Sequence, residues 1–467
     1  MKIDYDEALN FVNTYSRPSE LKITDIRTAD VVDSPAQTSF IKIFTNQGIC
    51  GYGEVRDGAS KLYALMLKGR LLGENPCNID YLFRRIKQFG NHSRQAGGVC
   101  GMELALWDLA GKAYGAPVYQ MLGGKFRDKA PSYYDTPIDT SVYKKGMDFD
   151  EVYDGKKAGE EIIKHVKDGW AFYKLGNLEG LLYDSGTVSF QSDLYEEMTE
   201  ARALPGRLKN GPDRLAYYAS RNREYFYADL EPSRKGIRYT EATLDRAEKF
   251  VKDIRSVIGD EIQFAFDHVG HMGVKDAIRL ARRLEKYNIA WLEDVFPWFR
   301  TDQYVKLARA TTTPICTGED FYLKESIEPL LASGGIDVVH PDILSAGGIM
   351  ETKKIGDMAQ KYGVKMAIHM CEGPVAYMAA GHIGVATNNF LAIETIQDLR
   401  DWWKDIAVSD PKRIYENGGV TPSERPGLGI LDLNDEVLRE HADPRYPEIW
   451  KSTEEWDEEY SVDRHWC

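Results

Sequence analysis

Apolar runs that end in a polar residue recur along the second half of the chain. Five of them close on an acidic or histidine side chain, at steps of 26, 26, 23 and 27 residues. A step of that length holds one strand, one helix and two loops, so it returns the chain to the same end of the next parallel strand. The five closing residues are Asp267 in IQFAFD, Glu293 in IAWLED, Glu319 in PICTGE, Asp342 in DVVHPD and His369 in KMAIH.

Three further runs bring the number of predicted strands to eight. APSYYDT (130–136) and AFYKLG (171–176) precede the five, and FLAIET (390–395) follows them. Eight strands alternating with helices predict a closed α/β barrel, whose active site lies at the carboxyl ends of the strands. An open doubly wound sheet is the alternative, because it also binds ligands at strand carboxyl ends.

The first 129 residues follow a different pattern. ITDIRTADVV and TSFIKIFTN alternate like antiparallel strands, and GICGYGE closes a hairpin. Apolar residues then recur at helical spacing over 102–113, until Gly115 and Pro117 end that helix. We therefore predict an N-terminal α+β domain over 1–129, the barrel over 130–400 and a C-terminal segment with an acidic tail over 401–467.

One segment interrupts the regular alternation. About 60 residues, 177–240, follow the second strand, where one βα step needs about 30. The segment is rich in Tyr, Arg and Glu, and its position predicts that it lies over the mouth of the barrel. A substrate lid and a surface or subunit contact both remain open as interpretations.

The charge of the chain excludes some classes of partner. A net charge of −14 argues against binding to nucleic acid or to an anionic membrane, since both favour a basic surface. No stretch approaches 18 consecutive apolar residues, and the start lacks the apolar core of a secretory signal. The six cysteines contain no C-x-x-C pair, which favours free thiols and a cytoplasmic location.

Three of the closing residues predict a metal site. Asp267, Glu293 and Glu319 would converge at the ends of neighbouring strands, and converging carboxylates repel one another unless a cation neutralises them. Oxygen ligands alone favour Mg²⁺, with Mn²⁺ as a second choice. A single such residue would more often cap a helix or form a salt bridge.

The next two closing residues predict a general base. Asp342 and His369 would end adjacent strands, where a carboxylate bonded to one imidazole nitrogen raises the basicity of the other. Lys174 ends the second strand. We expect it to act as an electrophile or a second base, or else to form a salt bridge to a carboxylate of the predicted metal site. Glu394 ends the eighth strand. We expect it either to donate a hydrogen bond to an enediolate or to be a buried partner of Lys174.

Two more histidines are weaker candidates. His268 and His271 flank Asp267, and either could act as a general acid. Alternation along the strand points His268 away from the predicted metal site, and His271 could instead cap the following helix.

These motifs closely resemble the mandelate racemase subgroup of the enolase superfamily, over roughly residues 23–432. ALWDLAGKAYGAPVYQMLGG is similar to the signature of its capping domain, and FAFD, WLED and TGED to its three metal-binding motifs. SAGGI, HIGVATNNFLAIE and PGLGI are similar to later segments, the last returning to the capping domain. The resemblance implies a modified (β/α)₇β TIM barrel with an N-terminal α+β capping domain. It also implies Mg²⁺-assisted removal of a proton α to a carboxylate, with Glu394 as electrophile.

Two departures from the family pattern guide the functional prediction. Racemases of the family carry Lys-x-Lys on the second strand, whereas Gly176 takes the place of the second lysine here. The specificity loop of the capping domain is very short (VVDSPAQT), so the 177–240 segment would have to close the site. We therefore predict a Mg²⁺-dependent dehydratase of an aldonate or aldarate that yields a 2-keto-3-deoxy acid, in a cytoplasmic homo-oligomer. A racemase, epimerase or cycloisomerase is the alternative, and a metal-stabilised binding or scaffold protein is the non-enzymatic one.

Overall fold

The structure is a computed structural model of the chain. It describes residues 16–32, 38–87, 91–136, 153–170, 172–176, 178, 239–267, 272–396, 402, 405–409 and 418–458. The chain divides into two compact units. The first comprises 1–134, 169–171 and 317–467, and the second comprises 135–168 and 172–316.

All eight predicted strands form, and they follow one another in chain order in a single sheet. The last strand also pairs with the first, so the sheet closes into a barrel and the open doubly wound alternative is wrong. A short strand, β13 (Gly419–Val420), pairs antiparallel to β4. The barrel strands are β4 (Ala130–Thr136), β5 (Tyr173–Leu175), β6 (Phe264–Phe266), β7 (Leu292–Glu293), β8 (Ile315–Thr317), β9 (Val338–Val339), β10 (Lys365–Ile368) and β11 (Phe390–Ile396).

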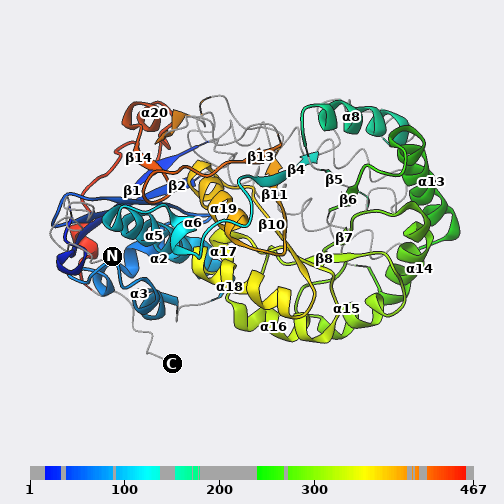
Figure 1. Ribbon diagram of the computed structural model, residues 1–467, viewed down its shortest axis with the longest axis horizontal. Helices are drawn as coiled ribbons and strands as arrows, with labels where there is room; N and C mark the ends of the chain where they lie inside the picture. The colour runs from blue at the N-terminus through cyan, green and yellow to red at the C-terminus, as the bar shows by residue number, and fades with distance from the viewer. Residues whose placement is uncertain are drawn as a thin grey trace, which may run out of the picture. The chain divides into compact units, whose positions relative to one another are not determined.

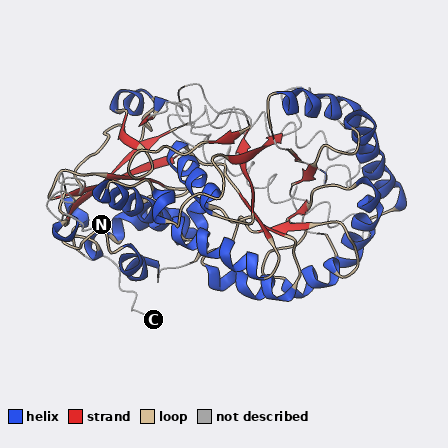
Figure 2. Cartoon of the chain, in the orientation of Figure 1, coloured by secondary structure: helices blue, strands red, loops and turns tan. Residues whose placement is uncertain are grey.

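Helices of the second unit lie outside its strands (Figures 1 and 2). In α14 (Val274–Leu284) the buried apolar residues are Ala277, Leu280, Ala281 and Leu284, the spacing that gives a helix one apolar face. The opposite polar face joins α14 to its neighbour α13, because Arg279 pairs with Glu241. The helices of this unit are α8 (Gly155–Lys167), α13 (Glu241–Ile258), α14 and α15 (Thr301–Ala308).

The first unit contains the remaining barrel helices together with the α+β domain. Strands β1 (Ile23–Val31), β2 (Thr38–Thr45) and β3 (Gly51–Glu54) form the predicted antiparallel sheet. Helix α5 (Cys100–Tyr114) packs so closely on β3 that a Cβ at Gly53 would lie 1.8 Å from the carbonyl oxygen of Gly101. As predicted, α5 ends at Gly115, which has a φ of 71°.

The other elements of the structure are short, except α18 and α19. The barrel helices of the first unit are α16 (Lys324–Ser333), α17 (Ile343–Ala346), α18 (Gly348–Lys361) and α19 (Pro374–Ala386). The remaining helices are α2 (Leu62–Met66), α3 (Ile79–Ile86), α4 (His92–Arg94), α6 (Val118–Met121) and α20 (Asp435–Glu440), and the remaining strands are β12 (Ala407–Ser409) and β14 (Ile430–Leu433). Single turns are η1 (Pro18–Glu20), η2 (Lys68–Arg70), η4 (Gln95–Val99), η7 (Glu285–Tyr287) and η9 (Glu454–Trp456).

Buried carboxylates join the α+β domain to two barrel helices within the first unit. Glu103 of α5 accepts hydrogen bonds from the N–H groups of Ile349 (2.7 Å) and Met350 (3.0 Å) at the start of α18. Glu54 of β3 does the same at the start of α19, where it accepts from Val375 and Ala376, both at 3.1 Å. Burial raises the pKa of both carboxyls to about 8, although the backbone donors oppose that shift. These caps fix the α+β domain to the last two βα steps.

None of the described helices combines the length and the apolar character that a membrane crossing requires.

Candidate active site

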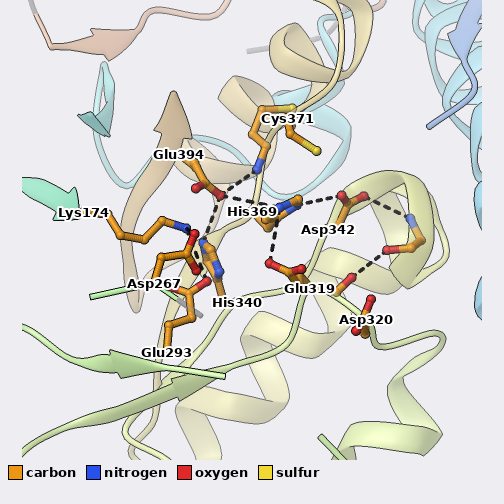
Figure 3. A network of polar contacts seen from close by, with 12 residues as sticks. Lys174, Asp267, Glu293, Glu319, Asp320, His340, Asp342, His369, Cys371 and Glu394 are labelled. Atoms are coloured by element: carbon orange, nitrogen blue, oxygen red, sulfur yellow. Dashed lines mark hydrogen bonds and ion pairs between the residues drawn. The ribbon is translucent and has the colours of Figure 1, made fainter. Parts of the chain in front are cut away.

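The predicted dyad forms at the ends of β9 and β10. Nδ1 of His369 lies 2.8 Å from Oδ2 of Asp342 (Figure 3). The other oxygen of Asp342 accepts from the N–H groups of Leu344 (2.6 Å) and Ser345 (3.1 Å), which also caps α17. The carboxylate is therefore held at both oxygens, so it fixes the imidazole ring and leaves Nε2 as the basic nitrogen.

Two carboxylates lie near that basic nitrogen. Nε2 of His369 is 3.4 Å from Oε2 of Glu319 and 3.8 Å from Oε2 of Glu394. Burial opposes the imidazolium, but the negative charge of Glu319 and of other neighbours, together with the bond to Asp342, raises the pKa of His369 well above its ordinary value. These neighbours therefore stabilise the imidazolium that His369 would become after it takes a proton.

Glu394 has partners that its sequence position did not reveal. Its Oε2 accepts from the N–H of Met370 at 3.2 Å and lies 3.7 Å from Nε2 of His340, a fully buried residue. His340 in turn lies 2.8 Å from the hydroxyl of Tyr133 on β4. Sequence reasoning missed His340, although it stands two residues before Asp342 in DVVHPD and shares its strand-end position.

Lys174 lies in the second unit, between two of the predicted metal ligands. Its Nζ is 3.1 Å from Oδ2 of Asp267 and 3.4 Å from Oε1 of Glu293 (Figure 3). The other oxygen of Glu293 accepts from Trp291 Nε1 at 2.7 Å. Of the two interpretations of Lys174, the structure contains the salt bridge to carboxylates that we predict to bind the metal.

The donor set suits a hard divalent cation. Asp267 and Glu293 end β6 and β7, and they already share one positive charge, that of Lys174. Glu319 follows two residues after β8, which pairs with β7 through Glu293 and Cys316. Three successive strands thus each end in a carboxylate, and oxygen donors alone favour Mg²⁺. His268, His271 and most of the 177–240 segment lie outside the described residues.

Two family models match the chain. Residues 11–123 match the N-terminal domain of the mandelate racemase / muconate lactonizing enzyme family, and residues 230–436 match the enolase C-terminal domain-like family. A solved structure of a mandelate racemase/muconate lactonizing enzyme-like protein from Rubrobacter xylanophilus aligns with a TM-score of 0.70 at 25% identity. The alignment covers 91% of this chain and 98% of that chain.

Curated relatives cover nearly the whole chain. The D-xylonate dehydratase of Haloferax volcanii is 28% identical over 92% of this chain and 91% of its own length. The D-galactonate dehydratase of Pectobacterium atrosepticum is 27% identical over 92% of this chain and 98% of its own length.

Proposed function

We propose that this chain, which belongs to the mandelate racemase subgroup of the enolase superfamily, is a Mg²⁺-dependent dehydratase that removes water from a sugar acid. The relatives' names bear out the expected enzyme class, a hydro-lyase acting on a sugar acid. The observation that carries the proposed chemistry is the 2.8 Å contact of His369 with Asp342, next to Glu319 and Glu394.

Asp267, Glu293 and Glu319 are the residues that would hold the cation. When bound, Mg²⁺ would stabilise the negative charge that develops on the substrate carboxylate as the α-proton leaves. It would also neutralise the charge of Glu319. The pKa of the neighbouring His369 would then fall, so that its imidazole is a neutral base at neutral pH.

In this proposal His369 takes the α-proton at Nε2, while Asp342 holds Nδ1–H and stabilises the imidazolium. Glu394 would donate a hydrogen bond to the enediolate, and Lys174 would contribute positive charge. The imidazolium would return its proton to the departing β-hydroxyl in a syn elimination. Loss of that hydroxyl as water gives an enol, which ketonises to a 2-keto-3-deoxy acid.

The position of Lys174 favours dehydration over racemisation. A two-base racemase needs a second, neutral base opposite His369, but the buried Lys174 ammonium is paired with Asp267 and Glu293. Such pairing stabilises the charged form, which cannot accept a proton. Gly176 removes the other lysine position, so His369 is the one base that we assign among the described residues, and elimination requires only one.

A substrate screen tests the proposal directly. Purified protein with Mg²⁺ is incubated with a panel of aldonates and aldarates, and 2-keto acid formation is detected as the semicarbazone. We expect turnover of at least one acid, lost on chelation and lost in His369→Asn. Release of epimerised acid without 2-keto acid would indicate the isomerase alternative. Absence of any metal-dependent turnover would support the non-enzymatic alternative.

A further inference from the structure

A partly buried arginine of the α+β domain lies against the dyad. Arg56 follows β3, its side chain is 14% exposed, and the carboxylate of Asp342 beside it is fully buried. Nε of Arg56 lies 3.5 Å from Oδ2 of Asp342, the same oxygen that contacts His369. One carboxylate oxygen is therefore shared between a guanidinium and the imidazole of the base.

Three other side chains hold the guanidinium in place. Its Nη1 lies 2.7 Å from Nε2 of His92 and donates to Oγ of Ser345 at 3.3 Å, and its Nε lies 3.6 Å from Oε1 of Glu372. A guanidinium only donates hydrogen bonds, so Nε2 of His92 must be an acceptor and His92 is neutral. Burial and then the charge of Arg56 lower the pKa of His92, in agreement with that assignment.

The guanidinium lies close to two neighbouring carboxyls, with its Nε 3.5 Å from Asp342 and 3.6 Å from Glu372. The side chains of Asp342 and Glu372 are both fully buried. Burial and then the charge of Asp342 raise the pKa of Glu372 well above its ordinary value. Burial would raise the pKa of Asp342 too, but Arg56 and His369 hold it well below its usual range. Besides Arg56, Asp342 has the N–H groups of Leu344 and Ser345 and Nδ1 of His369 as partners, so its anionic form is the better stabilised of the two.

We propose that Arg56 is a positioning residue for proton abstraction, which fixes the Asp342 carboxylate as the anionic partner of His369. This inference rests on the proposed function in that His369 is taken as the base. It assigns part of the catalytic apparatus to the α+β domain, beside the strand-end residues of the barrel. In this proposal Arg56 acts on the base through Asp342, and other side chains bind the substrate.

A chemical-rescue experiment separates positioning from substrate binding and from simple stability. Arg56→Ala should lower kcat and the rate of α-proton exchange in D₂O by about 10- to 100-fold, as loss of a supporting partner typically does, while KM stays near the wild-type value. Millimolar guanidinium should restore part of the lost kcat, whereas equal ionic strength as NaCl should not. Arg56→Lys, which keeps the charge with a different geometry, should fall between Ala and wild type.

A matched control comes from the same unit. Arg85 is also partly buried and pairs with Glu74, and among the described residues it does not contact the dyad. Arg85→Met should lose stability without losing kcat. If Arg56→Ala raises KM with kcat unchanged, Arg56 binds substrate and the proposal is wrong. If guanidinium rescues neither Arg56→Ala nor Arg56→Lys, a positioning role is also excluded.

A spectroscopic measurement tests the inference without any substrate. In ¹⁵N NMR spectra of the Mg²⁺-loaded protein, the neutral ring of His369 should carry its proton on Nδ1 only, since Asp342 accepts it. In Arg56→Ala the signal should become that of mixed tautomers. An unchanged single tautomer would overturn the proposal even if the sugar-acid screen succeeds. A screen without turnover would reject the proposed function and leave this test intact.

Discussion

The buried ammonium of Lys174 allows a direct test of the cation site. Its distances of 3.1 and 3.4 Å to Asp267 and Glu293 correspond to a gross attraction of about 5 kcal/mol for each pair at an effective dielectric constant of 20. Desolvation offsets much of this, and removing one partner of a buried ion pair costs about 3–5 kcal/mol. Lys174→Met should therefore lower the melting temperature by roughly 3–5 °C in the absence of divalent cations.

Mg²⁺ should reverse most of that loss. At about 100 times its dissociation constant a ligand stabilises the folded state by about 2.7 kcal/mol, and the variant should bind Mg²⁺ more tightly because the competing ammonium is gone. The assay is differential scanning calorimetry with chelator and across a Mg²⁺ series. The melting temperature of Lys174→Met should rise more steeply with Mg²⁺ than that of the wild type.

Lys68 provides the matched control for this experiment. It is equally buried and lies 2.5 Å from Asp25 and 2.6 Å from Asp457, far in sequence from the predicted metal ligands. Lys68→Met should lose comparable stability and respond to Mg²⁺ only as the wild type does. Equal responses of Lys174→Met and Lys68→Met to Mg²⁺ would refute the assignment of Asp267 and Glu293 as metal ligands.

Three further predictions use other parts of the site. His369→Asn should abolish both turnover and α-proton exchange with D₂O while substrate still binds in calorimetry, and Asp342→Asn should retain more activity because the imidazole survives. Normal exchange in His369→Asn would place the base elsewhere. Glu293→Gln should lose most of the thermal stabilisation by Mg²⁺, and an unchanged Mg²⁺ response would contradict its role as a ligand. Replacing the 177–240 segment by a short Gly-Ser linker should raise KM and lower kcat if the segment closes the site. A change in light-scattering mass with normal kinetics would instead identify a subunit contact.

The barrel could be predicted from the sequence because its signals are local. Each strand is a short apolar run that ends in a polar residue, and the near-constant step between runs dictates parallel neighbours. The closed order of the eight strands confirms that prediction. The helix at 102–113 and its end could also be predicted from the sequence, since Gly115 ends it with the positive φ that glycine favours. The domain boundaries at 129 and 400 remain predictions.

The supporting residues of the site could not be predicted in the same way. Arg56 meets Ser345 across 289 residues of sequence, and no local pattern marks such a pairing. His340 does not close an apolar run, so the spacing of the strand ends does not mark it, although a histidine within an apolar strand needs a polar partner once it is buried. Glu103 carried a signal of the same kind, as a carboxylate inside a helix whose neighbours are almost all apolar.

The capping carboxylates have a consequence for recombination between members of this family. A chimaera that joins a foreign α+β domain to this barrel at residue 129 would separate Glu54 and Glu103 from the helix ends that they cap. Each mismatched junction would leave buried N–H groups or a buried carboxylate without partners, at about 1–3 kcal/mol for each group. Exchange of the first 129 residues alone should therefore destabilise the protein. A donor segment would have to bring its own versions of the 348–386 helices. The α+β domain and the helices that it caps must therefore be exchanged together.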